Sequence, residues 1–160
     1  MAPLRTLHVF VSAAWSSAPR VRELHEKLWT RGDVQIESTW AEKSNGEVAP
    51  ELCESTSDED IACAWRSNRD GIIRSHVVIV LGDTPTREGH AEAEYARWLN
   101  KAILWVGKPT LSSRMFKYLT FATDDELVNF IRSRDDELRD YISRGHLTDS
   151  LRALPVLASE

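Results

Sequence analysis

Glu92, near the start of a short helix, is the residue of this sequence best placed to do chemistry. The segment GHAEAEYARWLNKAILWVG, residues 89–107, joins an amphipathic helical pattern to a compact apolar run. The spacing predicts a helix that opens at Gly89, with Glu92 in its first turn, followed by a buried strand. Backbone N–H groups and the helix dipole stabilise negative charge there by about 0.3–1 kcal/mol, so we expect an ionised carboxylate. An ionised carboxylate can act as a nucleophile.

A simpler explanation exists for an acidic residue in a first turn. Such residues commonly do no more than balance the helix dipole, and on local features alone this is the commoner outcome. Glu94 illustrates the point, because it lies about 200° around the helix from Glu92 at about 3.6 residues per turn. We therefore expect Glu94 to be solvated and to lie outside any pocket that contains Glu92.

Apolar runs alternate with helical patterns along the chain and define the elements that must position this glutamate. We predict strands at residues 7–11, 34–38, 77–81, 102–106 and 119–122, and helices carrying residues 21–29, 57–73, 89–101 and 123–145. Ser57 and Thr123 are expected to cap two of these helices. This alternation implies an α/β fold in which helices cover both faces of a parallel sheet. Residues 1–160 are interpreted as a single domain with a C-terminal helical extension from about residue 124.

The loops that follow the strands should meet at one edge of the sheet. In open α/β sheets, ligands bind at the carboxyl ends of the strands, near the switch in strand order. The loops expected there are residues 12–20, the long polar stretch 39–56, residues 82–88 and residues 107–113. Arg134 interrupts the last apolar stripe, so we expect the second half of that helix to project or to pack on another subunit. The tail, residues 146–160, is expected to add one helical turn.

Composition excludes several classes of partner. The chain has 20 Lys and Arg against 25 Asp and Glu, a net charge of -5, and no basic block, so a nucleic-acid surface is not expected. No apolar stretch approaches the roughly 20 residues that span a bilayer, and no leader pattern is present, so no membrane partner and a cytoplasmic location are expected. Cys53 and Cys63 are interpreted as unpaired thiols.

Common catalytic and cofactor motifs are missing. His90 and Glu92 match half of a zinc deaminase signature, but its Pro-Cys-x-x-Cys half does not occur. No GxGxxG, Walker or GxSxG motif occurs either. We therefore expect neither a metal nor an organic cofactor, and we expect His90 to be a pocket-rim or exposed residue. Trp15 and Trp40 follow predicted strands and offer aromatic planes for a nucleobase, although packing is the commoner role for tryptophan.

Three segments of the chain resemble the nucleoside 2-deoxyribosyltransferase superfamily, which includes the 2'-deoxynucleoside 5'-monophosphate N-glycosidases. They are residues 89–107, the segment VFVSAAW at residues 9–15, and NRDGIIRSHVVIVL at residues 68–81, and the resemblance covers roughly residues 7–131. It implies a flavodoxin-like (Rossmannoid) three-layer sandwich with a central five-stranded parallel sheet. It also implies that Glu92 is the nucleophile that attacks an N-glycosidic bond.

Two positions depart from the family pattern. The tyrosine that supports the family's glutamate from the first strand corresponds to Phe10, and the aspartate of the central helix corresponds to Asn68. Asp70 could replace that aspartate only if the register shifts, because it lies on a different helical face.

The serine-rich loop after the first strand is the expected anion site. Hydroxyl groups, exposed N–H groups and a guanidinium at a helix start suit a phosphate or a 5'-hydroxyl. The residues expected to bind it are Ser12, Ser16, Ser17 and Arg20. Asn68 or Asp70 is expected to bind the sugar, and Trp15 or Trp40 the base.

The resemblance further implies a site that two subunits share. The glycine of the family motif falls on Gly89, next to His90 at the rim. Because family members associate, we expect a homodimer or a higher homo-oligomer, in which Ser112 or Ser113 acts in trans. The expected partner is a small-molecule nucleoside or nucleotide.

The sequence thus predicts an N-glycosidase or 2-deoxyribosyltransferase that acts on a nucleoside or nucleoside 5'-monophosphate through Glu92. Two alternatives stay open. One is a nucleotide-binding module whose catalysis is impaired, favoured by Phe10 and Asn68. The other is a NAD-cleaving domain of the Toll/interleukin-receptor type, which also uses a glutamate on a flavodoxin-like scaffold.

Overall fold

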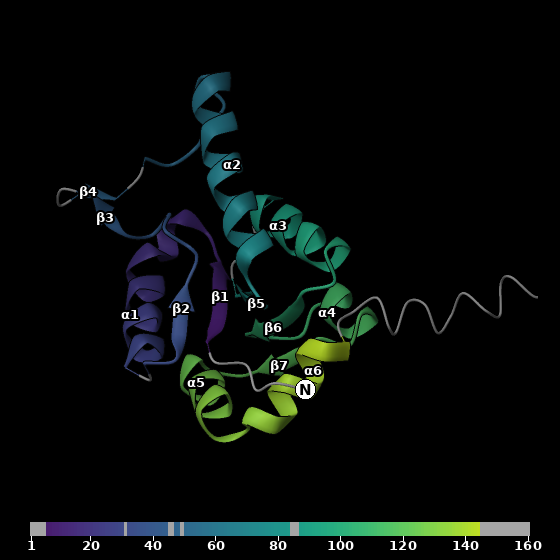
Figure 1. Ribbon diagram of the computed structural model, residues 1–160. Helices are drawn as coiled ribbons and strands as arrows, with labels where there is room; N and C mark the ends of the chain where they lie inside the picture. Colours follow the sequence, from purple (N-terminus) through teal and green to yellow (C-terminus); the bar gives the residue numbers. More distant parts are fainter. Residues whose placement is uncertain (1–5, 31, 45–46, 49, 84–86, 145–160) are drawn as a thin grey trace, which may run out of the picture.

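A five-stranded parallel sheet forms the centre of the protein (Figure 1). The computed structural model describes residues 6–30, 32–44, 47–48, 50–83 and 87–144. The strands are β1 (Leu7–Ser12), β2 (Val34–Ile36), β5 (Val77–Leu81), β6 (Ala102–Val106) and β7 (Leu119–Phe121). Their spatial order is β2-β1-β5-β6-β7, and every pairing is parallel. This is the flavodoxin-like order, so the predicted fold class is confirmed.

The middle of the sheet is apolar on both faces. All residues of β5 and β6 are buried, as expected for strands that helices cover on two sides. Strand β1 pairs with β2 on one side and with β5 on the other, so that Val9 lies opposite both Ile36 and Val77. The central strands therefore hold the carboxyl ends of β1 and β5 at the same edge.

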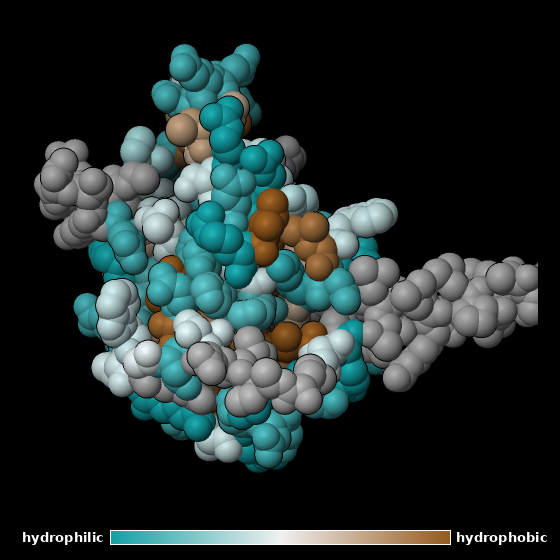
Figure 2. All heavy atoms as spheres, viewed as in Figure 1, coloured by the Kyte–Doolittle hydropathy of each residue, from teal (hydrophilic) through white to brown (hydrophobic). Residues whose placement is uncertain are grey.

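Two helical layers cover the sheet. Helices α1 (Ala18–Trp29), α5 (Asp124–Ser133) and α6 (Asp135–Arg144) contribute side chains to the core on one face. Helices α2 (Asp58–Arg74) and α3 (Arg87–Trp98) contribute to the core on the other face. Figure 2 shows that most of the outer surface in this view is hydrophilic, with small hydrophobic areas between the polar side chains. None of the helices in the described ranges is long and apolar enough to cross a bilayer.

The predicted helix caps at Ser57 and Thr123 are confirmed. The Ser57 hydroxyl accepts a hydrogen bond from the Asp60 N–H at 3.2 Å, and the Thr123 hydroxyl accepts one from the Glu126 N–H at 3.2 Å. Cys53 and Cys63 are unpaired, as expected, and both are exposed.

Short elements lie where the sequence predicted loops. The stretch after β2 contains an antiparallel pair, β3 (Lys43–Ser44) and β4 (Glu47–Val48). A 3-10 helix, η1 (Trp15–Ser17), follows β1, and α4 (Leu111–Met115) follows β6. These elements are too short to be recognised from hydrophobic periodicity.

The prediction of one continuous helix at residues 123–145 is wrong. The helix is interrupted at Arg134, which is the C-cap of α5, and α6 begins at the next residue. The expectation that the second half projects or packs on another subunit is also wrong, because Leu138 and Tyr141 are buried in this chain. The Tyr141 hydroxyl donates a hydrogen bond to the Ile103 carbonyl of β6 at 2.9 Å. The tail at residues 146–160 lies outside the described residues.

A glycine lets α2 approach β1 closely. A Cβ atom at Gly71 would lie 2.7 Å from the Glu37 carbonyl oxygen and 3.0 Å from the Phe10 ring. Phe10 is fully buried, and the Glu37 carbonyl belongs to the backbone, so neither group can move aside freely. Gly71 thus sets how near the site-bearing part of α2 comes to the sheet.

We predict that Gly71→Ala destabilises the protein by about 1–3 kcal/mol, because overpacking outweighs the roughly 1 kcal/mol that alanine gains over glycine within a helix. Urea unfolding followed by circular dichroism measures the change. Arg66→Ala, an exposed position on the same helix, serves as the control and should be nearly neutral. A Gly71→Ala protein as stable as the parent would show that the contact relaxes at no cost.

A buried imidazole links α1 to the start of the loop after β2. His25 Nε2 lies 3.0 Å from the Ser38 hydroxyl, which accepts a hydrogen bond from the Val11 N–H at 3.0 Å. The tautomer of the ring decides whether Nε2 donates to the Ser38 hydroxyl or accepts from it. Burial lowers the pKa of His25 from 6.5 to about 4.

This lowered pKa predicts a pH-dependent stability. Below pH 6.5 His25 becomes protonated in the unfolded chain but stays neutral in the folded chain. The free energy of unfolding therefore falls as pH drops toward 4, and the contribution of His25 is constant above pH 6.5. The loss amounts to at most about 3 kcal/mol. Urea unfolding of the parent and of His25→Leu between about pH 7 and pH 4.5 isolates this group. If the free energy of unfolding changed with pH equally in the parent and in His25→Leu, the lowered pKa of His25 would be contradicted.

Candidate active site

A cavity of about 300 Å³ opens at the carboxyl ends of β1 and β2, on the face covered by α2 and α3. It adjoins the boundary between β1 and β5, where the strand order reverses and where open α/β sheets bind ligands. Loops after β1 and β2, residues 50–52 and the two helices supply its walls. The lining residues are Ala13, Trp15, Thr39, Trp40, Pro50, Glu51, Leu52, Ala64, Ser67, Asn68 and Glu92.

Glu92 enters this cavity from α3. The helix begins at Arg87, so Glu92 lies in its second turn and the prediction of a first-turn position is wrong. The dipole effect falls off beyond the first turn, and it therefore contributes less than the sequence suggested. Glu92 is only 8% exposed, and its neighbour Ala93 packs into the core between α3 and the sheet. Burial beside a cavity distinguishes Glu92 from an ordinary dipole partner.

Glu94 has the position expected of it. Its carboxylate is exposed and forms an ion pair with Arg97 at 3.0 Å. The pair is an ordinary surface contact within α3. Glu94 therefore offers a matched control for Glu92 on the same helix.

Two tryptophans that follow neighbouring strands line the cavity. Trp15 in η1 and Trp40 after β2 both line the cavity, and Trp15 is 41% exposed. The Trp40 Nε1–H donates a hydrogen bond to the Val11 carbonyl at 2.8 Å, which fixes this ring by its edge. Rigid aromatic walls of this kind suit a planar ligand.

Helix α2 brings Asn68, and not Asp70, to the cavity. Asn68 lines it together with Ser67 and Ala64. The Asp70 carboxylate instead forms an ion pair with Arg69 at 3.1 Å, and Asp70 is not among the lining residues. The geometry therefore favours Asn68 of the two predicted sugar ligands.

The two predicted residues of β1 point to the α2–α3 side. Phe10 packs in the core with Ile72 and Ala93. Ser12 lies two residues on, and so on the same face of the strand. Its side chain is fully buried, and within the described parts of the chain its hydroxyl has no hydrogen-bond partner.

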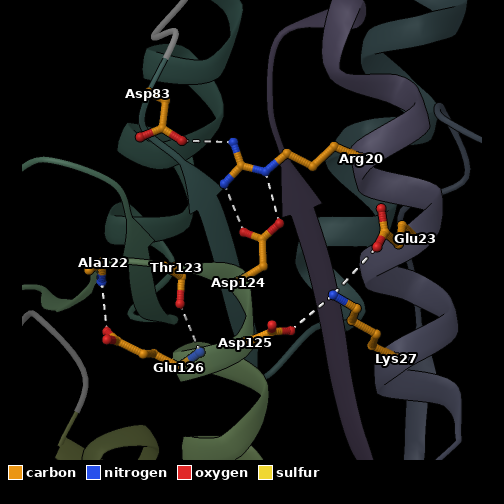
Figure 3. Close-up of polar contacts among 9 residues, drawn as sticks. All are labelled: Arg20, Glu23, Lys27, Asp83, Ala122, Thr123, Asp124, Asp125 and Glu126. Carbon is orange, nitrogen blue, oxygen red and sulfur yellow. Dashed lines mark hydrogen bonds and ion pairs between the residues drawn. The ribbon is translucent and has the colours of Figure 1, made fainter.

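The remainder of the predicted anion loop is arranged differently from the expectation. Ser16 and Ser17 lie in η1, outside the residues that line the cavity, and Ser17 makes no capping hydrogen bond to α1. Arg20 donates two hydrogen bonds to the Asp124 carboxylate, both at 2.8 Å, and one to Asp83 at 2.7 Å (Figure 3).

These contacts give Arg20 a structural role. Hydrogen bonding to Asp124 raises the pKa of the guanidinium far above its usual range, with a smaller effect from Asp83, although partial burial opposes both. Two carboxylates around one cation leave no positive charge for a phosphate. The predicted 5'-phosphate role of Arg20 therefore finds no support in this geometry.

The other predicted residues lie away from the cavity lining. Gly89 is half-buried in α3, and His90 is exposed beside it. The Ser113 hydroxyl is buried and closes a capping box with Thr110, which occupies it within its own chain. The role of Ser112 or Ser113 in trans and the expected homo-oligomer remain predictions.

Sequence reasoning missed several of the lining residues. Glu51, Leu52 and Pro50 belong to the long polar stretch, whose length alone indicated a functional loop. The other missed residues, Thr39, Ala64 and Ser67, belong to no sequence motif that would indicate a binding site. Within the described ranges, no three His, Cys, Asp or Glu side chains gather as metal ligands would.

Comparison with solved structures found similar folds. The CMP N-glycosidase BcmB of Clostridium botulinum matches with a TM-score of 0.51 and 16% identity, over 78% of this chain and 97% of that chain. A conserved protein from Enterococcus faecalis V583 matches with a TM-score of 0.56 and 9% identity, over 81% and 99%. Scanning for protein families and searching curated proteins gave no match. The predicted resemblance to the N-glycosidases is thus confirmed for the fold.

We predict that Arg20→Ala destabilises the fold by about 1 kcal/mol, since a charge-assisted contact is weakened by partial exposure and the variant leaves two carboxylates close together. Thermal unfolding at low and high salt measures this loss, which should shrink as salt screens the carboxylates. Lys27→Ala removes the exposed pair with Asp125 at the same helix contact and should matter less. An unchanged melting temperature for Arg20→Ala would refute the structural role.

Proposed function

We propose that this chain is an enzyme that hydrolyses or transfers the N-glycosidic bond of a nucleoside or nucleoside 5'-monophosphate. The observation that carries the proposal is the buried Glu92 carboxylate in the wall of a cavity that two indoles also line. The fold that the chain shares with a CMP N-glycosidase supports the same reaction class.

Glu92 acts as the nucleophile in this proposal. Its carboxylate oxygen attacks the anomeric carbon while the bond from that carbon to the base nitrogen breaks, through an oxocarbenium-like transition state. The product is a glycosyl ester of Glu92 and a released base. Water, or a second base, then attacks the same carbon and frees the carboxylate, with overall retention of configuration.

The remaining lining residues orient the substrate. Trp15 and Trp40 stack on the base, an interaction worth about 1–3 kcal/mol for each stacked base. Asn68 and Ser67 offer an amide and a hydroxyl for sugar hydroxyls. The buried Ser12 hydroxyl at the end of β1 is a further donor on the same side of the sheet.

A second candidate is a nucleotide-binding module with impaired catalysis. It is favoured by Phe10, which supplies no hydroxyl to steady the glutamate, and by an amide at Asn68 where the resembling family has a carboxylate. Calorimetric titration that shows nucleoside binding without base release identifies this case. Release of nicotinamide from NAD, with no reaction of nucleosides, identifies the NAD-cleaving alternative.

We predict that Glu92→Gln lowers base release by about 10²-fold or more and leaves the fold intact, because the amide keeps the shape of the side chain but is a poor nucleophile. Chromatography of products from a panel of nucleosides and monophosphates measures the rate, and circular dichroism checks the fold. Glu94→Gln, on the exposed side of α3, should retain the rate of the parent.

The intermediate provides a second readout. Mass spectrometry of the parent quenched during turnover should detect a glycosyl adduct on the peptide that contains Glu92. Similar turnover by Glu92→Gln and the parent would refute the assignment of the nucleophile.

A further inference from the structure

A second cavity, of about 430 Å³, lies between α1 and the segment that follows β2. We call it the α1 pocket. Its described lining consists of Arg22, His25, Glu26, Trp29, Thr30 and Glu42. The first four of these residues have the i, i+3, i+4, i+7 spacing of a single helical face. Helix α1 packs on the face of the sheet opposite to α2 and α3 (Figure 1), and the described linings of the two cavities have no residue in common.

His25 brings a buried hydrogen-bonding atom to this pocket. Its side chain is only 6% exposed, and its Nε2 lies 3.0 Å from the buried Ser38 hydroxyl. Within the described parts of the chain, its other ring nitrogen, Nδ1, is buried and has no hydrogen-bond partner. The Glu42 carboxylate on the pocket wall lies 3.8 Å from Nδ1, which is too far for a hydrogen bond. A buried polar atom without a partner lowers stability, and a ligand that supplies the partner removes this penalty.

The imidazole selects the kind of group that can approach it. Burial lowers the pKa of His25 to about 4, so the ring is neutral near pH 7. A neutral imidazole either donates or accepts a hydrogen bond at Nδ1, according to its tautomer. Heterocycles that carry ring nitrogens and N–H groups side by side can satisfy both tautomers.

The rim of the α1 pocket offers an aromatic plane and an acceptor. Trp29 is the last residue of α1 and is 68% exposed, so its indole is open to a flat ligand. Glu42 is exposed on the opposite wall, on the side that Nδ1 faces, and its carboxylate oxygens accept hydrogen bonds from N–H donors. A flat ring with an amino group on its edge matches this combination.

Side-chain contacts hold the walls of the pocket in place. Arg22 Nη1 donates a hydrogen bond to the Ala41 carbonyl at 2.9 Å, which ties the segment after β2 to α1. At the end of α1, Arg132 of α5 donates one to the Thr30 hydroxyl at 2.9 Å. The pocket is therefore formed without a ligand, and a preformed site loses less conformational freedom on binding.

We propose that the α1 pocket is a second ligand site, which binds a planar heterocycle that carries an amino group, such as a free nucleobase. The ring stacks on Trp29, and a ring nitrogen or ring N–H group forms a hydrogen bond with His25 Nδ1. The amino group donates to the Glu42 carboxylate. This site goes beyond the proposed reaction of Glu92 and does not depend on it.

Nuclear magnetic resonance of the intact protein with ¹⁵N-labelled histidine tests the site directly. Adenine is the probe, and purine, which lacks the amino group, is its matched control. Adenine should shift the Nδ1 resonance of His25 with a dissociation constant of about 1 mM or below, and should leave His8 at the other end of β1 unaffected. Purine should bind about three- to tenfold more weakly. An unchanged His25 resonance, or equal affinity for adenine and purine, would overturn the proposal.

Variants of the rim locate the bound adenine. Trp29→Leu should weaken binding about five- to hundredfold, because stacking on the indole is lost. Trp98→Leu removes a similarly exposed tryptophan from α3 and should have no effect. Circular dichroism checks that both variants are folded. Affinity for adenine that is the same in Trp29→Leu and in the parent would contradict the proposed site.

The acceptor has its own pair of variants. Glu42→Ala should weaken the binding of adenine about threefold or more and should narrow the difference between adenine and purine. Glu23→Ala, an exposed residue of α1 outside the described lining, should retain that difference. A full difference in Glu42→Ala would contradict recognition of the amino group by this carboxylate.

Adenine can also enter the cavity that contains Glu92, and a further variant separates the two sites. Trp15 lines only that cavity, so Trp15→Leu should leave the shift of His25 and its concentration dependence unchanged. Binding that is lost in Trp15→Leu and kept in Trp29→Leu would place adenine in the candidate active site and overturn the proposal. Base release plays no part in these measurements, so failure of the proposed function would leave their outcome unaffected.

Discussion

The position of β1 between β2 and β5 is the constraint on which the rest of the structure depends. Parallel strands that pair on both sides end at a common edge, and the loops that follow β1 and β2 begin there. Those loops bring Trp15 and Trp40 to one cavity. The hydrogen bond from the Trp40 indole to the Val11 carbonyl ties the second loop directly to β1. The geometry of the cavity thus follows from the burial of the central strands.

The contact at Gly71 complements this constraint from the helical layer. Because no Cβ separates α2 from Phe10 and the Glu37 carbonyl, the helix lies directly on β1. Ile72, the next residue of α2, is buried in the core, and Asn68, one turn before Gly71, lines the cavity. A single residue without a side chain thereby couples packing to the placement of a ligand-binding group.

The carboxyl edge of the sheet is acidic, and its carboxylates have two kinds of surroundings. Asp83 and Asp124 share the Arg20 guanidinium, which joins the loop after β5 to the start of α5 and to α1 (Figure 3). Glu51 and Glu92 line a cavity in which no described side chain is cationic. The acidic groups of this edge thus belong partly to the ion pairs that hold the fold together and partly to the wall of the cavity.

The sequence by itself determined the features that depend on near neighbours. The apolar runs of β5 and β6, the caps at Ser57 and Thr123, and the separation of Glu92 from Glu94 around α3 all follow from local periodicity and local hydrogen bonding. The parallel sheet could be predicted because strands and helices alternate along the chain, and the resemblance supplied its flavodoxin-like arrangement. Local pattern made Glu92 a candidate, and the resemblance favoured catalysis over the simpler dipole explanation.

Only the tertiary structure decided which distant groups meet. The partners of Arg20 lie 63 and 104 residues away, so no local pattern showed that its guanidinium is paired with carboxylates. Glu51 joins the cavity only because the long loop folds back to α2, and Leu138 and Tyr141 return to the core only because the chain turns at Arg134. Periodicity reports which face of an element is apolar. The partner that covers this face, and the charge that a long side chain reaches, depend on how the whole chain is connected.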